Sequence, residues 1–294
     1  MTAVRPSPGG SAVEEAYHRC EEITRREAKN FAYGIRLLAP PKRQALSAVY
    51  ALARRIDDIG DGAGEPGAKL AALAGVRTSL VAIRAGTPPP EEDPVLVGLA
   101  DAARRYPIPL EAFDELIEGC EMDASGATYR TYEELRGYCR RVAGSIGRLS
   151  LGVFGTPDRT VTDPMADSLG TALQITNILR DIVEDRDQLR RIYLPAEDIS
   201  RFGCHPDLSG PIDAVSALVV FEARRAEELF AHGYQLLPLL ERRSRACVGT
   251  MAGIYRRLLG RIVDDPAAVL RGRVSVPTGQ KLLVAARSLV GRAA

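Results

Sequence analysis

The spacing of apolar positions along the chain is helical almost throughout. Between residues 41 and 60, apolar side chains return at steps of three and four, which places them on one face of an α-helix. The sequence lacks sustained alternation with a period of two, which is the pattern of a half-buried strand. The pattern predicts ten helices, at residues 13–30, 41–60, 68–85, 92–105, 110–121, 132–154, 164–188, 211–240, 243–262 and 278–291.

The breaks between these segments are rich in Gly, Pro, Ser and Thr, as in the Gly/Pro stretch at residues 60–67. None of them resembles a domain linker, because helical spacing resumes within a few residues. We therefore predict one all-α domain over residues 13–294. A flexible N-terminal tail at residues 1–12 precedes it, and the start of that tail is too poor in apolar residues for a signal peptide.

A first file of polar residues lies on the predicted helix 41–60 and its end. Tyr50, Arg54, Asp57 and Asp61 are spaced by four, three and four residues, so they share one helix face. Asp57 and Asp61 lie about 6 Å apart along the axis, and such carboxylates repel each other unless a cation or water separates them. Mg²⁺ prefers oxygen ligands and takes one or two carboxylates plus substrate phosphates. The file therefore indicates either a magnesium–diphosphate site or a solvated face paired with Arg54 and Arg55.

A second file lies on the predicted helix 164–188. Gly170, Gln174, Asn177, Asp181 and Asp185 are spaced by four, three, four and four residues. Their neighbours are apolar nearly all round the helix, which predicts that the helix is buried. A polar file on a buried helix is costly unless it lines a wet or metal-filled cavity. The second file therefore favours a ligand site more strongly than the first, and two matched files together predict a site for metal-bound diphosphate.

Cationic and small residues extend this prediction. Arg54, Arg180 and Arg191 lie near the two files in sequence, and guanidinium groups suit bidentate contact with phosphate, although each could instead form a surface salt bridge. The segment 142–147 places glycines in the middle of a predicted helix. Because glycine weakens a helix, this segment indicates either tight helix packing or room for an apolar chain.

Composition excludes several other functions. The net charge of +1 gives no bulk attraction to nucleic acid. The five cysteines and three histidines form no CxxC or HxxxH motif, so we expect reduced thiols and neither a zinc site nor a disulfide framework. No run approaches the ~20 apolar residues that span a bilayer, so any membrane contact is peripheral. The dinucleotide and P-loop motifs are absent, which argues against a reductase step with NADPH.

Several long motifs, in order, resemble the squalene/phytoene synthase family of head-to-head prenyl transferases over nearly the whole chain. Two shorter segments, 147–150 and 251–259, are most similar to the bacterial presqualene diphosphate synthases of hopanoid biosynthesis. The motifs that carry the family resemblance are Asn30-Phe-Ala-Tyr33, Arg36-Leu-Leu38, Tyr50 to Asp61, Tyr138 to Gly147, Gln174 to Asp185 and Arg191-Ile-Tyr-Leu-Pro195.

The resemblance implies an isoprenoid-synthase helical bundle with a central active-site cavity. It implies that Mg²⁺, or Mn²⁺ in its place, is bound by Asp57, Asp61, Asn177, Asp181 and Asp185. The implied contacts of the diphosphates or the metal are Arg54, Gln174, Asn177, Arg180 and Arg191. The implied residue near the reacting carbons is Tyr138, and the pocket-lining aromatic residues are Phe31, Tyr50 and Tyr255.

The implied reaction is the head-to-head (1′-1) condensation of two farnesyl diphosphates to presqualene diphosphate, with release of pyrophosphate and without NADPH. The implied setting is the cytoplasm, with peripheral contact at the inner face of the membrane and downstream hopanoid-pathway enzymes as partners. Three alternatives stay open. They are a phytoene synthase that uses geranylgeranyl diphosphate, a squalene synthase that uses NADPH, and a non-catalytic helical binding protein with this fold.

The sequence also departs from the family pattern. Asn30 and Ala53 stand where the family usually has Ser and Cys, and Arg190 replaces a usual glycine. The stretch from Asp185 to Arg191 is one residue longer than usual. The position of Arg191 relative to the diphosphate is therefore open at the level of sequence.

Overall fold

The chain folds entirely into helices in the computed structural model, which describes residues 10–28 and 30–291. No strand is present in these ranges, and the all-α, isoprenoid-synthase fold predicted from the sequence is confirmed. The α-helices are α1 (Gly10–Glu27), α2 (Phe31–Ile35), α3 (Pro40–Asp61), α4 (Pro66–Arg84), α5 (Pro94–Arg105), α6 (Ala112–Ala124), α7 (Tyr132–Cys139), α8 (Ser145–Phe154), α9 (Arg159–Glu184), α10 (Ala196–Arg201), α11 (Ile212–Gly233), α12 (Arg242–Asp264), α13 (Ala268–Arg271) and α14 (Thr278–Leu289). Two π-helical turns, η1 (Arg140–Gly144) and η2 (Asp185–Leu189), and one 3₁₀ helix, η3 (Tyr234–Leu239), complete the chain.

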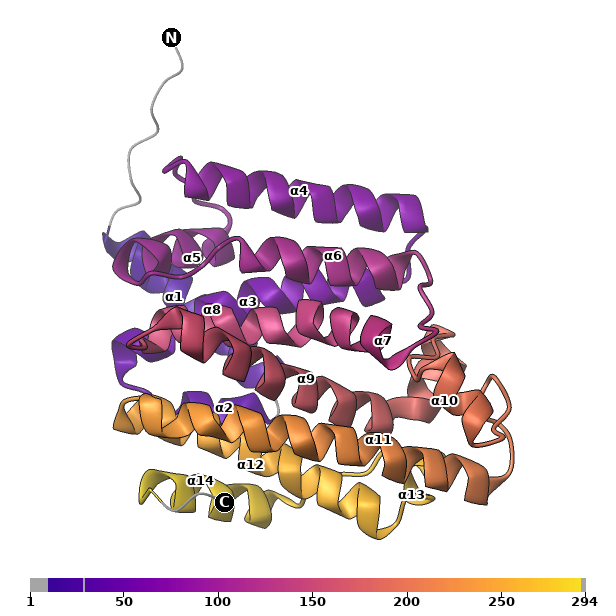
Figure 1. Ribbon diagram of the computed structural model, residues 1–294. Helices are drawn as coiled ribbons and strands as arrows, with labels where there is room; N and C mark the ends of the chain where they lie inside the picture. Colours follow the sequence, from indigo (N-terminus) through magenta and orange to yellow (C-terminus); the bar gives the residue numbers. More distant parts are fainter. Residues whose placement is uncertain (1–9, 29, 292–294) are drawn as a thin grey trace.

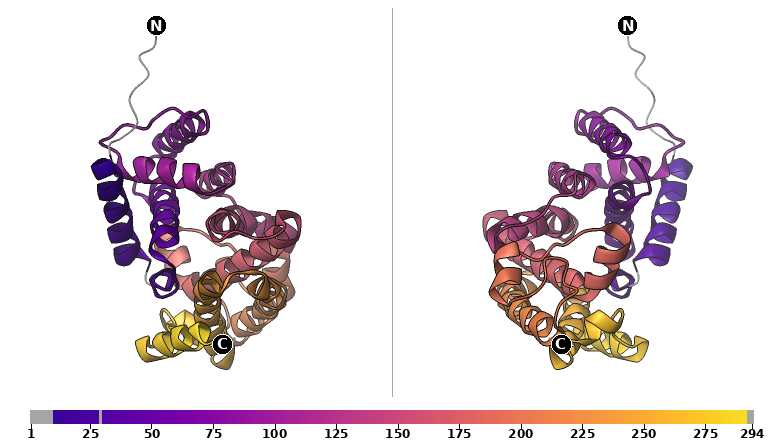
Figure 2. Two further views of the ribbon diagram at one scale, coloured as in Figure 1. Left: turned by 90° about the vertical axis from the view of Figure 1, so that its left-hand side faces the viewer. Right: turned by 90° about the vertical axis from the view of Figure 1, so that its right-hand side faces the viewer.

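The long helices form two groups that share one core. In Figure 1, α4, α6 and α3 lie towards the top, and α9, α11, α12 and α14 lie towards the bottom. Contacts of α8 with α3, α6 and α9 join the groups, and the short α2 packs on α12 rather than staying with its neighbours in sequence. The side views in Figure 2 show the same division, with the C-terminal helices gathered at one end. A single cluster of buried apolar residues runs from Tyr17 to Val276.

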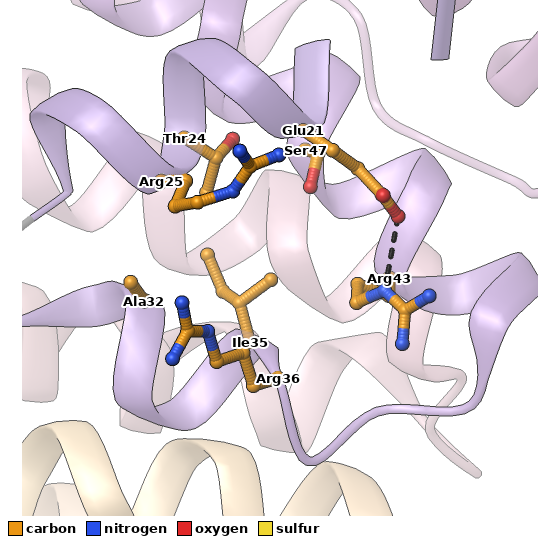
Figure 3. A pocket seen from close by; sticks show the side chains of 8 residues that line it. All are labelled: Glu21, Thr24, Arg25, Ala32, Ile35, Arg36, Arg43 and Ser47. Carbon is orange, nitrogen blue, oxygen red and sulfur yellow. Dashed lines mark hydrogen bonds and ion pairs between the residues drawn. The ribbon is translucent and has the colours of Figure 1, made fainter. Parts of the chain in front are cut away.

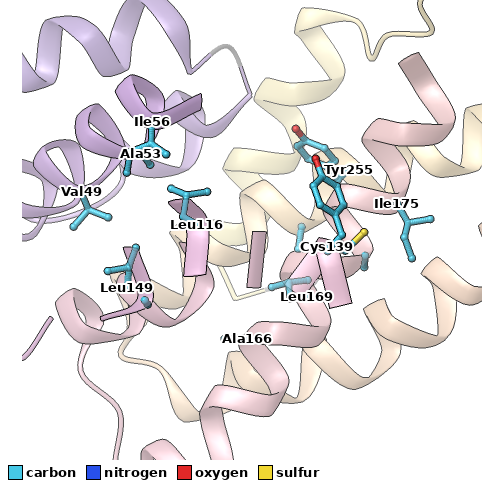
Figure 4. Packing of buried hydrophobic residues seen from close by; sticks show 14 of the residues in the cluster. Val49, Ala53, Ile56, Leu116, Cys139, Leu149, Ala166, Leu169, Ile175 and Tyr255 are labelled. Atoms are coloured by element: carbon cyan, nitrogen blue, oxygen red, sulfur yellow. The ribbon is translucent and has the colours of Figure 1, made fainter. Parts of the chain in front are cut away.

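Helix α3 begins at two prolines and buries one apolar face. Pro40 and Pro41 occupy the first turn, where their missing N–H groups cost no helical hydrogen bond. Val49, Ala53 and Ile56 pack in the core close to α6 and α8, as Figure 4 shows. Burying a side chain such as Ile56 contributes roughly 1.5–3 kcal/mol. This packing fixes the opposite, polar face of α3 in space.

Helix α9 starts five residues before its predicted first residue. The carboxylate of Asp158 accepts a hydrogen bond from the Thr160 N–H at 2.8 Å and caps the helix. Pro164 lies inside the helix rather than at its start. The predicted start at residue 164 was therefore five residues too late, because the Asp158 cap begins the helix earlier and Pro164 is accommodated within its first turns.

The predicted helix 132–154 forms as one continuous segment with a π-helical turn, η1, in the middle. Its glycines allow close contact with α9. A Cβ atom on Gly147 would lie 2.9 Å from the Ala166 carbonyl oxygen, and one on Gly170 would lie 2.5 Å from the Ala143 carbonyl oxygen. Of the two interpretations of this segment, tight helix packing therefore accounts for its glycines. Gly170, the first position of the second polar file, faces this contact.

Other departures from the predicted elements have simple causes. The predicted helix 211–240 ends as α11 at Gly233 and continues as the 3₁₀ helix η3, which contains Pro238. Helices α2, α10 and α13 were not predicted, because four to six residues are too few to show a helical period. Of the predicted tail, residues 10–12 begin α1, and residues 1–9 lie outside the described residues.

Two further features are the state of the cysteines and whether any helix could span a membrane. All five cysteines are free and buried. In the ranges that the structure describes, none of the helices has the length and apolar character needed to cross a bilayer.

Candidate active site

The two predicted aspartate pairs meet at the C-terminal ends of α3 and α9, and Arg191 joins them. Its Nη1 atom donates to Asp61 Oδ1 at 2.6 Å, and its Nη2 atom donates to the Gly60 carbonyl at 3.2 Å. Its backbone N–H donates to the Asp185 carbonyl at 2.9 Å. One residue therefore contacts both ends, although Asp61 and Asp185 are far apart in sequence.

The π-helical turn η2 explains how the longer stretch after Asp185 still reaches the site. A π turn holds more residues per turn than an α-helix, so it can absorb an inserted residue. Arg190 follows η2 with φ 54° and ψ 40°, the left-handed conformation that costs a non-glycine residue roughly 1–2 kcal/mol. This reversal directs the chain back, so that Arg191 contacts Asp61. Contact of Arg191 with a diphosphate stays a prediction.

The α3 pair is accessible but surrounded by protein. The side chains of Asp57 and Asp61 are 51% and 43% exposed. Arg54 contacts Asp57 Oδ2 at 3.1 Å and also pairs with Asp58, whereas Arg55 pairs with Asp93 instead. Desolvation and the Asp61 carboxylate raise the pKa of Asp57 to about 6.

The α9 pair is more enclosed. The Asp181 side chain is 13% exposed and contacts Arg180 Nε at 2.8 Å. Arg273, from the segment between α13 and α14, contacts the same carboxylate at 3.1 Å. Burial, followed by repulsion from the Asp181 carboxylate, raises the pKa of Asp185 to about 7. Each pair thus has one carboxylate whose pKa is raised, Asp57 or Asp185.

Gln174 and Asn177 precede this pair on the same face of α9, and both are half-buried. The Oδ1 atom of Asn177 is buried and has no hydrogen-bond partner within the described part of the chain. A buried amide oxygen without a donor is costly in the absence of a ligand. Asn177 is therefore the residue of the second file whose present environment most clearly indicates a missing partner.

The donor set fits Mg²⁺ ions that are shared with a substrate. Among the described residues, no three Asp, Glu, His or Cys side chains converge closely enough to hold a metal ion by themselves. Magnesium does not require such a cage, since it commonly takes one or two carboxylates and completes its shell with phosphate oxygens and water. Two carboxylates with raised pKa values and the unpartnered oxygen of Asn177 are suitable ligands of this kind. The residues present therefore fit the ion.

A group of tyrosines surrounds the buried carboxylate of Asp123 on α6. Tyr138 is 3% exposed and donates to Asp123 Oδ2 at 2.8 Å, and Tyr193 donates to Oδ1 at 3.0 Å. The rings of Tyr138 and Tyr193 stack with centroids 5.3 Å apart, and Tyr129 lies 5.3 Å from Tyr138. Burial raises the pKa of the Asp123 carboxyl and raises the pKa of Tyr138 well above its usual value.

This tyrosine group is connected to the aspartate pairs. Arg191 donates to the Tyr193 hydroxyl at 3.3 Å as well as to Asp61. A continuous chain of polar contacts therefore runs from Asp61 through Arg191 and Tyr193 to Asp123 and then Tyr138. Such a chain fixes the orientation of Arg191, Tyr193 and Asp123, because each of these groups has a partner on both sides.

A second aromatic group comes from three different helices. Phe31 of α2 lies 6.4 Å from Tyr50 of α3 and 5.8 Å from Tyr255 of α12, measured between ring centroids. Burial raises the pKa of Tyr50 to about 12, and nearby Arg54 opposes that shift. Tyr255 interacts with Arg180. The three aromatic residues predicted to line a pocket are thus together, beside two of the predicted diphosphate contacts.

Sequence reasoning missed four residues of this region, namely Tyr129, Asp123, Tyr193 and Arg273. Neither Asp123 nor Arg273 belongs to a polar file. Asp123 contacts Tyr138, which is 15 positions away in sequence, and Arg273 contacts Asp181, which is 92 positions away. Tyr193 lay inside a quoted family motif, Arg191 to Pro195, but its pairing with Asp123 depends on tertiary structure. Tyr129 precedes α7 and is recognisable only from its ring contacts.

Comparison with known proteins shows which family the chain is similar to. The chain is 48% identical over 283 residues to a phytoene synthase of Mycobacterium tuberculosis, covering 94% of this chain and 91% of that protein. A crystal structure of a dehydrosqualene synthase in complex with a ligand superposes with a TM-score of 0.87 and 28% identity, covering 96% of this chain and 98% of the other. A squalene synthase from Alicyclobacillus acidocaldarius gives a TM-score of 0.79 and 30% identity, covering 88% and 97%. The squalene/phytoene synthase family model matches residues 24–280, so the chain belongs to the squalene/phytoene synthase family.

Proposed function

We propose that this protein condenses two geranylgeranyl diphosphates head to head, in a reaction that depends on Mg²⁺. The observation that carries the proposal is the meeting of the two aspartate pairs, on α3 and at the end of α9, through Arg191. Two acidic pairs with arginines between them suit two diphosphate groups bound side by side, because metal ions and guanidinium groups together balance their charge.

The diphosphates bind to three arginines in this proposal. Arg54, Arg180 and Arg191 are each paired with an aspartate and come from two helices and a loop. A guanidinium group has five N–H donors, so each can keep its aspartate and still contact phosphate oxygens. These charges favour the departing pyrophosphate over the bound ester, because charge on the leaving group grows as the C–O bond breaks.

The carboxylates of both pairs and the amide of Asn177 would hold the metal ions. When bound, Mg²⁺ would withdraw charge from the diphosphate and assist loss of pyrophosphate. The residues proposed to hold it are Asp57, Asp61, Asn177, Asp181 and Asp185, with Gln174 beside them on α9.

The aromatic side chains protect and orient the carbocation. Faces of aromatic rings attract cations, and Tyr129, Tyr138 and Tyr193 present three rings in one group. Apolar surroundings also keep out water, which would otherwise capture the cation. After the acceptor double bond attacks the allylic cation, loss of a proton closes a cyclopropane that still carries the acceptor's diphosphate. Loss of that second diphosphate, rearrangement of the resulting cation and loss of a second proton then give the C40 hydrocarbon without a reductant. Tyr138 could accept the first proton while it passes its own to Asp123 along their 2.8 Å hydrogen bond, with released pyrophosphate as the alternative base.

The choice of a C20 substrate is supported by the relatives. The phytoene synthase of Mycobacterium tuberculosis matches this chain at 48% identity, well above the 28% and 30% of the dehydrosqualene and squalene synthase structures. Those two structures favour the second candidate, in which farnesyl diphosphate gives presqualene diphosphate, as the sequence analysis predicted. NADPH is required only if that intermediate is reduced further to squalene.

A product assay tests the proposal and separates the candidates. Purified protein is incubated with Mg²⁺ and either the C15 or the C20 diphosphate, with and without NADPH, and pyrophosphate and lipid products are measured. We expect a C40 hydrocarbon from the C20 substrate without NADPH, with one pyrophosphate released per substrate consumed, because the product keeps neither diphosphate. Presqualene diphosphate retains one diphosphate, so it releases half as much. Absence of pyrophosphate release with both substrates, under conditions where Mg²⁺ and folding are verified, would rule out the reaction.

The cytoplasmic location, the peripheral contact with the membrane and the hopanoid-pathway partners remain predictions. The hopanoid partners belong to the C15 candidate, because presqualene diphosphate leads to that pathway. An apolar C40 product fits delivery to a membrane equally well, so peripheral contact is proposed for either substrate.

A further inference from the structure

A separate cavity of about 210 Å³ lies between α1, α2 and α3. Figure 3 shows arginine side chains around it from three different segments of the chain. Thr24 and Arg25 come from α1, Ile35 and Arg36 from the end of α2, and Arg43 and Ser47 from α3. No residue of the proposed catalytic site lines this cavity.

The cavity carries an excess of positive charge. Arg25, Arg36 and Arg43 contribute three guanidinium groups, and Glu21 contributes the single carboxylate, which leaves a net charge of +2. Glu21 is held by Arg43, whose Nε atom donates to it at 2.9 Å. Across the described ranges, Arg25 and Arg36 form no hydrogen bond or ion pair with a side chain. Their charges are therefore available to an anion.

Ser47 supplies independent evidence for a ligand. Its side chain is 1% exposed, yet its hydroxyl has no hydrogen-bond partner among the residues that the structure describes. Buried hydroxyl groups are nearly always hydrogen-bonded, since leaving one unpaired costs stability. Ser47 is one of the residues that line the cationic cavity. A small acceptor held in the cavity is therefore a candidate partner for its hydroxyl.

The cavity is distant from the aspartate pairs although it uses the same helix. Arg43, Ser47, Tyr50 and Arg54 are spaced by four, three and four residues, so they continue the first polar file towards the start of α3. Ser47 precedes Asp57 by ten residues, which is about 15 Å along the axis. An anion at Ser47 is therefore distinct from a diphosphate held by Asp57.

We propose that this cavity binds a phosphate or pyrophosphate group. Three guanidinium groups and a hydroxyl are donors that match phosphate oxygens. The volume lies below the ~300–1,000 Å³ typical of pockets for larger organic ligands, so it suits a small charged group rather than a prenyl chain. The group comes either from a soluble anion or from the phosphate of a lipid such as phosphatidic acid. The inference does not depend on the identity of the prenyl substrate.

Calorimetric titration of the full-length protein tests this site. Pyrophosphate and inorganic phosphate are titrated in EDTA into the Arg191→Gln variant, which weakens anion binding at the catalytic site. We expect saturable binding that weakens at least about tenfold when Arg36→Gln is added, and about threefold to tenfold with Ser47→Ala. Arg104→Gln, an exposed arginine on α5, is the matched control and should change nothing. Thermal unfolding verifies that each variant is folded.

A second arm distinguishes the sources of the phosphate group. Vesicles of phosphatidylcholine, with and without phosphatidic acid, are sedimented with wild-type protein and with Arg36→Gln. Binding that requires both phosphatidic acid and Arg36, without binding of soluble anions, assigns the cavity to a lipid headgroup. The proposal is overturned if neither soluble anions nor phosphatidic acid bind, or if Arg36→Gln and Ser47→Ala both bind as tightly as their parents.

Discussion

The two aspartate pairs perform the same proposed task in different surroundings. On α3, the side chains of Asp57 and Asp61 are about half exposed, whereas Asp181 on α9 is 13% exposed and held by two arginines. In each pair one carboxylate has a raised pKa, Asp57 or Asp185. The comparison indicates that the same proposed ligand chemistry can operate in exposed and in enclosed surroundings, and that burial decides how much each residue also matters for stability.

Removing one carboxylate from either pair should lower kcat/KM the most. We expect Asp57→Asn and Asp181→Asn each to lower kcat/KM by about 10³-fold, because each removes charge that binds the metal and diphosphate. Only Asp181→Asn should also destabilise the fold, by about 1–3 kcal/mol, since it leaves the enclosed guanidinium of Arg180 without its main partner. Steady-state kinetics and urea unfolding measure the two effects. Equal destabilisation by both variants would contradict the contrast between the pairs.

Arg191→Gln should disconnect the two pairs. We expect kcat/KM to fall about 10²-fold, because the variant loses a diphosphate contact and the link from Asp61 to Tyr193. Arg186→Gln is the matched control, since Arg186 is close in sequence but pairs with Asp187. Steady-state kinetics are measured for both variants. If Arg186→Gln loses as much activity as Arg191→Gln, the loss is not specific to the contacts of Arg191 with Asp61 and Tyr193.

Tyr138→Phe should lower kcat moderately. It removes the hydrogen bond to Asp123 but keeps the aromatic ring, so we expect kcat to fall about tenfold with KM nearly unchanged. Tyr106→Phe, a tyrosine away from the site, should behave as wild type. If Tyr138→Phe keeps its full kcat, the hydroxyl has no part in the reaction and only the ring contributes.

Substitutions of Arg190 test whether the left-handed turn after η2 is needed, and their expected effect is smaller. Arg190 has a left-handed backbone, so Arg190→Gly should stabilise the fold by up to about 1 kcal/mol and Arg190→Val should destabilise it. Thermal unfolding at fixed pH measures both. Should the two variants be equally stable, the left-handed conformation at this position is not required.

The pH dependence of stability should differ slightly between the pairs. Both Asp57 and Asp185 have folded-state pKa values above those of the unfolded chain, so the folded protein binds more protons and its free energy of unfolding falls as pH rises from about 4. The fall is centred on the folded pKa of each group, about 6 for Asp57 and about 7 for Asp185, and ends about one pH unit above it. Urea unfolding in EDTA should therefore show that Asp57→Asn and Asp185→Asn both reduce the fall in the free energy of unfolding above pH 4, and that only Asp185→Asn reduces the part that extends above about pH 7. Glu222, whose pKa is raised to about 7, contributes the same slope in all variants.

Much of the fold was predictable because the helices are long and amphipathic. Helical spacing gave the long elements and placed both polar files on single faces, and that part required only the period of the α-helix. The ends of α9 and α11 were less accurate, since Asp158 and Pro238 act locally and are weak signals beside the longer pattern.

The remainder of the site could not be predicted because it depends on tertiary contacts. Asp123 and Arg273 contact the site from elements that show no unusual pattern of their own. The longer stretch after Asp185 was visible in the sequence, but its accommodation by a π turn and a left-handed Arg190 was not. The same limit applies to Ser47, whose unpaired hydroxyl is recognisable only once its neighbours are known.

The most direct test of the account is a double-variant experiment on pyrophosphate release. Wild type, Asp57→Asn, Asp181→Asn and the combination are compared with geranylgeranyl diphosphate and Mg²⁺. If the pairs on α3 and α9 act as one catalytic unit, the double variant should be little slower than either single variant, because each already disables the unit. Losses that multiply fully, or a single variant that releases pyrophosphate at the wild-type rate, would contradict the claim that the two pairs form one site.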